Sequence, residues 1–196
     1  MITEPPYPGN VIRFKHYKGY YNRQEYKMAI SDALVAEFDH EMQGTRKTLE
    51  RVPDDKFDWK SHEKSYTMQA LSSHLANIPT WMTMTLNQES LDVMPEGEPE
   101  FKSPQAKDTA ELLRFFDENV AEARKVLAGT GDQTFMQNWT LLAGGQEVFT
   151  MPKITVVRAF IFSHIIHHRA QLTVYLRMNG APVPALYGPS ADEDGM

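Results

Sequence analysis

The chain has 196 residues, a formal net charge of −6 and no cysteine. This length fits one domain, and the lack of cysteine excludes disulfides, thiolate metal ligands and cysteine nucleophiles. The acidic residues are dispersed and no block of lysine or arginine is present, which argues against a nucleic acid partner. The N-terminal sequence is not typical of a signal peptide, and no apolar run is long enough to cross a bilayer. We therefore expect a cytoplasmic protein with no membrane partner.

The chain divides into an irregular arm and one helical domain. Residues 1–27 are rich in proline, glycine and tyrosine and lack a helical period, which predicts an irregular N-terminal arm. Residues 28–196 form the predicted domain. Its first helix covers residues 28–51, where apolar side chains recur every three or four positions. A second helix is expected to begin at a Thr67 cap and to kink at Pro79, which lacks a backbone N–H.

The second half of the domain predicts two more long helices. Residues 92–104 are rich in glutamate and proline and are expected to form a surface loop, after which Asp108 caps the third helix. Residues 132–152 predict either a short hairpin or a coil over one end of the bundle. The fourth helix covers residues 152–180. Four amphipathic helices without a clear strand pattern predict an all-α fold, a four-helix bundle with one long crossover connection.

Three histidines lie where they can bind one metal ion. On the fourth helix, His168 lies about 40° around the axis from His164, and both share an apolar face. Two imidazoles at i and i+4 can converge on one cation, as they do in zinc metalloproteases. His74 lies on the apolar stripe of the second helix. Taken alone, His74 fits an ordinary core residue. Burial of His164 and His168 side by side without a metal, by contrast, costs about 1–3 kcal/mol for each ring nitrogen left without a partner.

Other polar residues on the inner faces are secondary candidates. Gln171 and Tyr175 share the face of the histidine pair. They are interpreted either as residues that orient ligands or substrate, or as residues that pack and hydrogen-bond between helices. Glu41 lies on the apolar stripe of the first helix. It is interpreted either as a fourth ligand or general base, or as a carboxylate paired with an arginine such as Arg46.

The remaining histidines and the arginines of the fourth helix are expected outside the site. The helical wheel places four of its side chains toward solvent: Arg158, Arg169, Thr173 and Arg177. Four histidines are expected at the surface, in loops or at the edge of a helix: His16, His40, His62 and His167. The eleven methionines, together with Trp81 and Trp139, are attributed to core filling rather than to a binding pocket.

Several segments resemble the DinB-like (damage-inducible) family of the DinB/YfiT-like superfamily. The C-terminal run HIIHHRAQLTVYLRMNGAPVP (164–184), with YGPSADE (187–193), is similar to the ending of these proteins. VPDDKFDWK (52–60), HEKS (62–65) and LSSHLA (71–76) are similar to the first loop and second helix of the family. The resemblance covers residues from about 28 to 193 and leaves only the N-terminal arm outside it.

The resemblance implies a four-helix bundle, often a homodimer, with a divalent metal on three histidines. These positions match His74, His164 and His168. The family commonly has glycine where this chain has Ala170, a position that faces away from the proposed ligands. Relatives in the superfamily include thiol-dependent S-transferases and a thiol-dependent isomerase. Zinc, nickel and iron all accept three imidazoles, so the metal stays open.

Three functional hypotheses follow. In the first, the protein is a metal-dependent enzyme that activates a low-molecular-weight thiol or a water against a small electrophilic substrate, because three histidines leave a coordination position open. In the second, it is a stress-response or binding protein in which the metal only staples the bundle. In the third, it is an interaction protein without metal.

Overall fold

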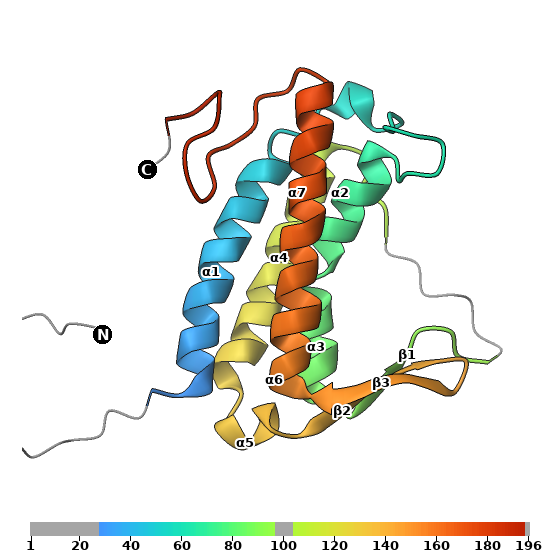
Figure 1. Ribbon diagram of the computed structural model, residues 1–196, viewed down its shortest axis with the longest axis vertical. Coiled ribbons are helices and arrows are strands. Elements are labelled where there is room, and N and C mark those ends of the chain that lie inside the picture. The colour runs from blue at the N-terminus through green and yellow to red at the C-terminus, as the bar shows by residue number, and fades with distance from the viewer. Residues whose placement is uncertain (1–27, 97–103, 195–196) are drawn as a thin grey trace, which may run out of the picture.

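The computed structural model describes residues 28–96 and 104–194, and its body is a bundle of four helical rods (Figure 1). The predicted arm, residues 1–27, lies outside the described residues, as does most of the predicted loop. The long helices are α1 (Ile30–Leu49), α2 (Met68–Asn77), α3 (Thr80–Asn87), α4 (Thr109–Gly129) and α7 (Ser163–Met178). Shorter helical segments are η1 (Asp54–Lys56), α5 (Asp132–Phe135), α6 (Lys153–Thr155) and the π-helix η2 (Val156–Phe162).

Four helical rods pack around one core: α1, α2 followed by α3, α4, and the continuous run of α6, η2 and α7. α1 lies against α4 and α7, while α2 and α3 lie against α4 and against the rod made by α6, η2 and α7. Large apolar side chains from every rod fill the centre, and among the most deeply buried are Phe38, Leu75, Phe116, Ile165 and Leu172. The bundle part of the fold prediction is therefore confirmed.

The helix ends follow the capping residues of the sequence. The Thr67 hydroxyl accepts a hydrogen bond from the Ala70 N–H at 3.1 Å, and the Asp108 carboxylate accepts one from the Glu111 N–H at 2.8 Å. The kink predicted at Pro79 is a break, since α2 ends at Asn77 and α3 begins at Thr80.

The last helix ends as its Asn-Gly sequence predicts. Gly180 has a φ of 71°, and the N–H of Ala181 donates to the carbonyl of Leu176 at 3.0 Å. This pairing is a Schellman motif, which glycine favours because a left-handed residue is required directly after the helix.

The expectation of an all-α fold is wrong, because the protein also carries a three-stranded mixed sheet. β1 (Ser90–Asp92) pairs in parallel with β2 (Asn138–Ala143), which pairs antiparallel with β3 (Gln146–Pro152). The β2–β3 hairpin agrees with one of the two alternatives predicted for residues 132–152. β1 escaped prediction because three residues are too short to show an alternating pattern, and it exists only through its partner strand.

The side chain of Asp92 connects β1 to the turn between β2 and β3. The Asp92 carboxylate, at the end of β1, accepts hydrogen bonds from the backbone N–H groups of Gly144 at 3.0 Å and Gly145 at 2.7 Å. The Met94 N–H donates to the same carboxylate at 2.9 Å, and this bond, followed by those from Gly145 and Gly144, lowers the pKa of Asp92 because each favours the charged form. The predicted loop at residues 92–104 thus begins as the end of a strand.

The orientation of α7 differs from the helical wheel in one respect. Arg169, expected toward solvent, is only 2% exposed, and the most buried side chains on this helix are Ile165, Leu172 and Leu176. The expected wheel was centred on the histidines, whereas the core lies about 100° further round the helix axis. His164 and His168 therefore flank the core and are half-buried.

Among the helices of the described ranges, none combines the length and apolar character that a bilayer span requires.

Candidate metal centre

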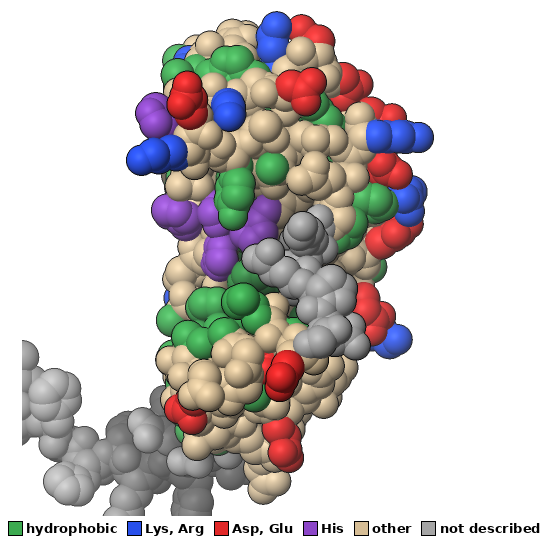
Figure 2. Space-filling model, turned by 90° about the vertical axis from the view of Figure 1, so that its right-hand side faces the viewer, with side chains coloured by type: hydrophobic (Ala, Val, Ile, Leu, Met, Phe, Trp, Pro, Cys, Tyr) green, Lys and Arg blue, Asp and Glu red, His purple; other side chains and the backbone are tan. Residues whose placement is uncertain are grey.

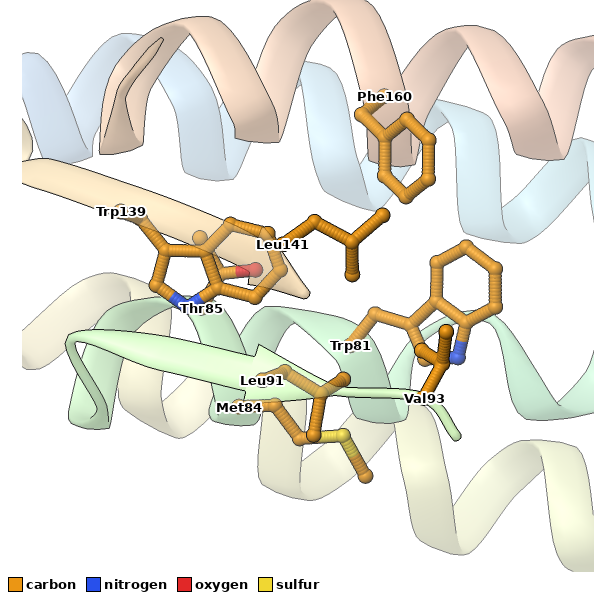
Figure 3. A pocket seen from close by; sticks show the side chains of 8 residues that line it. All are labelled: Trp81, Met84, Thr85, Leu91, Val93, Trp139, Leu141 and Phe160. Atoms are coloured by element: carbon orange, nitrogen blue, oxygen red, sulfur yellow. The ribbon is translucent and has the colours of Figure 1, made fainter. Parts of the chain in front are cut away.

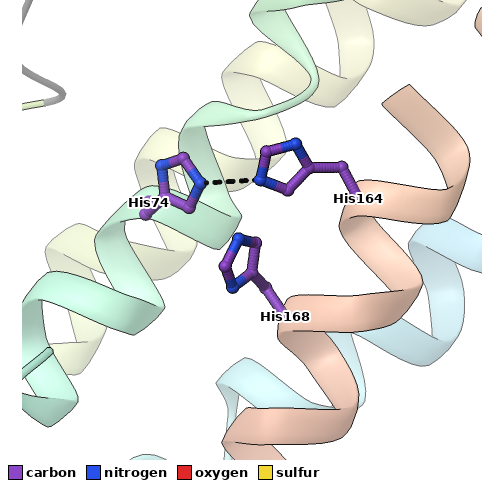
Figure 4. A group of neighbouring side chains, drawn as sticks. All are labelled: His74, His164 and His168. Atoms are coloured by element: carbon purple, nitrogen blue, oxygen red, sulfur yellow. Dashed lines mark hydrogen bonds between the residues drawn. The ribbon is translucent and has the colours of Figure 1, made fainter. Parts of the chain in front are cut away.

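The structure brings His74 of α2 together with His164 and His168 of α7 (Figure 4). The Nε2 atoms of His74 and His164 lie 3.2 Å apart, and one ring nitrogen from each of the three residues lies within 4.8 Å of the others. Nitrogens bound to one zinc at 2.0–2.1 Å in tetrahedral geometry lie about 3.3 Å apart. The three imidazoles therefore fit a divalent cation after small side-chain adjustments.

A π-helix positions the histidine pair on α7. The N–H of Ser163 donates to the carbonyl of Arg158, five residues earlier, so η2 holds more residues per turn than the α-helix that follows. Such π segments often occur at functional sites because they change the direction in which side chains leave the helix. His164 follows this transition directly and faces α2.

Aromatic rings enclose the histidines on one side. Trp81 of α3 meets the His164 ring edge to face, with centroids 5.0 Å apart, and the Phe160 ring lies 5.8 Å from the same imidazole. Trp81 also lies 5.9 Å from the ring of His74. These rings partly desolvate the site and leave the histidines few alternative orientations.

Gln171 orients His168. Its side-chain oxygen lies 2.8 Å from Nδ1 of His168, and because an amide oxygen only accepts, this nitrogen carries the proton. The lone pair of His168 is then on Nε2, which leaves this nitrogen free to bind a cation. The orienting role predicted for Gln171 agrees with this contact.

The electrostatic environment keeps the ligands neutral. Burial, together with the neighbouring His168, lowers the pKa of His74 to about 4, and burial lowers that of His164 to about 4 as well. The pKa of His168 is also lowered by burial, although its hydrogen bond to Gln171 acts in the opposite direction. At neutral pH all three imidazoles are therefore uncharged, and each has one ring nitrogen with a free lone pair.

Glu41 does not join the histidines. Its carboxylate forms a buried ion pair with Arg169, Oε2 to Nη2 at 2.6 Å, and accepts a hydrogen bond from the Tyr187 hydroxyl at 2.7 Å. The predicted pairing of Glu41 with an arginine is correct, but Arg46 is the wrong partner, since it binds Asp117 at 2.8 Å. Arg169 was missed because the wheel placed it toward solvent.

Tyr175 supports the loop before α2 rather than the metal ligands. Its hydroxyl donates to the carbonyl of Tyr66 at 3.1 Å and accepts a hydrogen bond from Ser61 at 3.2 Å. Its ring meets Trp59 edge to face at 5.1 Å. Tyr175 thus packs against the loop that leads into α2, the helix that carries His74.

The other histidines have surface positions. His40, His62 and His167 are exposed, as predicted, and His16 lies outside the described residues. The His167 ring lies 4.9 Å from that of His168 but is not among the three that share a possible metal position. Figure 2 shows histidine side chains gathered on one face of the molecule, so the site reaches the surface.

Two hollows of different character adjoin the centre. A polar groove of about 410 Å³ borders His168 and includes Ser61, Lys64, Tyr66 and Gln171 in its walls. On the other side of the site, the Trp81 and Phe160 rings are part of the lining of an apolar cavity of about 60 Å³ (Figure 3). Sequence reasoning missed this cavity because it attributed Trp81 and Trp139 to core filling.

The fold and site define a helical-bundle protein with a candidate three-histidine metal centre. The chain belongs to the DinB family, whose profile matches residues 26–195. The family resemblance seen in the sequence is therefore confirmed.

Solved structures show the same fold. A DinB-like protein from Bacillus cereus ATCC 10987 superposes with a TM-score of 0.62 at 19% identity, covering 80% of this chain and 97% of that one. A DinB-like protein, YjoA, from Bacillus subtilis gives a TM-score of 0.59 at 16% identity, covering 78% and 95%. No curated protein matches the chain.

Proposed function

We propose that this protein is a metal-dependent enzyme in which His74, His164 and His168 hold a divalent cation. The proposed reaction is S-transferase-like or hydrolase-like: a small thiol or a water, which the cation would activate when bound, attacks a small electrophilic substrate. The observation that carries the proposal is the convergence of three half-buried, neutral imidazoles from two helices on one point.

The character of the ligand set supports catalysis. Three neutral imidazoles leave the charge of a divalent cation uncompensated and leave at least one coordination position open. When bound, such a cation lowers the pKa of a water or thiol at that position. Zinc, nickel and iron fit this ligand set, and availability decides between them.

The chain's own residues supply the orientation. Gln171 holds His168 in one tautomer, while Trp81 and Phe160 exclude water from the flank of His164. Because the chain has no cysteine, a thiol must enter as a diffusible co-substrate. The polar groove beside His168 provides a route to the open position, which favours an enzyme over a metal that only staples the bundle.

Elemental analysis of protein purified without an affinity tag tests the first half of the proposal. We expect about one equivalent of a transition metal per chain, and its loss in His74→Ala, His164→Ala and His168→Ala. His167→Ala is the matched control, because it removes an adjacent imidazole outside the group, and it should keep the metal. A wild-type protein that binds no added zinc, nickel or iron would overturn the proposal.

Activity of the same proteins tests the second half. The metal-loaded wild type is assayed with a panel of low-molecular-weight thiols against a chromogenic electrophile, and with water alone. Turnover that disappears with the metal while circular dichroism stays unchanged supports an enzyme. Variants that unfold on losing the metal, with no turnover in the wild type, support the structural staple instead.

A further inference from the structure

We propose that the apolar cavity beside His164 is the subsite for a short aliphatic arm of the substrate. This inference rests on the proposed function and names its substrate class: a small electrophile with a straight apolar chain of about three carbons. An apolar cavity known to bind benzene has a volume of about 150 Å³, more than twice the 60 Å³ of this cavity.

The position of the cavity connects it with the metal centre. The Trp81 and Phe160 rings stack with their centroids 5.5 Å apart, and both rings also contact His164. The same aromatic pair therefore contacts His164 and lines the cavity, whose other lining side chains are drawn in Figure 3. Figure 2 shows hydrophobic side chains gathered below the histidines, on the same face of the molecule.

The walls of the cavity select an uncharged occupant. They come from α3, β1, β2, η2 and the residue after β1, and Thr85 is the one member of the lining that carries a hydroxyl. No charged side chain belongs to this lining. A water in such a space finds few hydrogen-bond partners, whereas a methylene chain fills it without loss.

Trp139 adds a second observation. The indole is only 2% exposed and lines the cavity, yet its Nε1–H has no hydrogen-bond acceptor within the described part of the chain. Buried donors are rarely left unsatisfied, and an exception calls for an explanation such as a ligand.

The two hollows beside the centre therefore divide the reactants by polarity. The larger groove at His168 is polar and has the ammonium of Lys64 in its wall, which suits a hydrophilic thiol that carries a carboxylate. The smaller cavity at His164 suits the apolar electrophile. His168 lines the groove, and the Trp81–Phe160 pair beside His164 lines the cavity, so the candidate metal position is flanked by two hollows of different polarity.

A series of straight-chain hydroxamic acids tests the subsite without any assay of turnover. Hydroxamates bind divalent metals through their head group, so acetohydroxamate to hexanohydroxamate, together with benzohydroxamate, place tails of increasing size beside the zinc-loaded protein. Dissociation constants are measured by calorimetry and by quenching of tryptophan fluorescence, because Trp81 and Trp139 both line the cavity. We expect affinity to rise about fourfold for each added methylene until the cavity is full, after about three carbons, and then to stop.

Cavity variants sharpen the test. Leu141→Phe fills the cavity and should abolish the gain with chain length, whereas Leu91→Ala enlarges it and should extend the gain to longer chains. Neither residue belongs to the three-histidine group, so both variants should keep wild-type affinity for acetohydroxamate and a full complement of zinc. Val174→Phe, which alters the polar groove instead, is the matched control and should keep the wild-type trend.

The outcomes separate this inference from the proposed function. Acetohydroxamate binding with no dependence on chain length, or benzohydroxamate as the tightest ligand, overturns the aliphatic subsite and leaves the metal centre in place. A chain-length dependence that survives Leu141→Phe but disappears in Val174→Phe assigns the tail to the groove and also overturns it. Failure to bind zinc overturns the proposed function and this inference together.

Discussion

His74 and His164 face each other between α2 and α7 with their Nε2 atoms 3.2 Å apart, although 90 positions separate them in the chain. Without a metal, one of these nitrogens carries a proton and donates it to the lone pair of the other, whereas a bound cation would take a lone pair from each. The packing of α2 against α7 therefore decides whether the candidate metal centre exists. Five predictions test the histidine group and the buried cluster around Glu41.

Metal binding should stabilise the folded protein. A ligand present at 100 times its dissociation constant adds about 2.7 kcal/mol to the free energy of unfolding. We therefore expect a chelator to lower the melting temperature of the zinc-loaded wild type but to leave that of His74→Ala unchanged. Differential scanning calorimetry with and without chelator measures the effect. Equal chelator sensitivity in both proteins would show that the metal binds elsewhere.

The metal-free protein should lose stability as the pH falls from about 6.5 toward 4. The unfolded chain binds protons on His74 and His164 near the ordinary pKa of 6.5, whereas the folded protein resists protonation until about pH 4. Acid within this window therefore favours the unfolded state, and the contribution is absent above it. Urea unfolding at several pH values should show a shallower dependence for the His74→Gln, His164→Gln double variant. His62→Gln, at an exposed histidine, should behave as the wild type.

Removal of one partner from the buried Glu41–Arg169 ion pair should be severely destabilising. Arg169 is 2% exposed, and its guanidinium binds the Glu41 carboxylate at 2.6 Å and the Glu41 carbonyl at 2.9 Å. Glu41→Ala leaves a buried charge uncompensated, so a loss of about 3–5 kcal/mol is expected in chemical denaturation. The Glu41→Leu, Arg169→Met double variant should recover much of this loss. A double variant less stable than Glu41→Ala would show that the ion pair itself is net stabilising.

Tyr187 allows a milder test of the same cluster, because Tyr187→Phe removes only the hydroxyl that bonds Glu41. We expect a loss of about 1–2 kcal/mol in the same denaturation experiment, since a hydrogen bond to a charged group is stronger than a neutral one. An unchanged free energy of unfolding would mean that water replaces this hydroxyl.

Gln171 should control metal affinity from outside the ligand set. Replacement of a side chain that orients a ligating histidine commonly weakens metal binding 10- to 100-fold. Gln171→Leu removes the acceptor for the Nδ1 proton of His168, whereas Gln171→Glu retains one. Competition with a metal indicator should therefore show weaker zinc binding for the leucine variant and near-normal or tighter binding for the glutamate variant. Equal affinities in all three proteins would remove Gln171 from the site.

Much of the local structure was predictable from the sequence because it depends on neighbouring residues. Thr67 and Asp108 cap their helices as expected, Pro79 interrupts one, and Gly180 ends another. The i, i+4 spacing of His164 and His168 also places both rings on one side of α7 without help from the rest of the fold. Each of these features is governed by contacts within one helical turn.

Other features depend on pairing between segments that are far apart in the chain. β1 forms only where β2 lies beside it, and Arg169 is buried because α1 presents Glu41 to it across 128 positions. The apolar cavity likewise needs α3, the sheet and η2 together. The sequence by itself therefore determined the helices and the histidine pair, because short-range hydrogen bonds and periodicity specify them. Only the tertiary structure decided that His74 lies beside this pair, that Arg169 is the partner of Glu41, and that an apolar cavity forms beside Trp81 and Phe160, because packing of distant side chains creates all three.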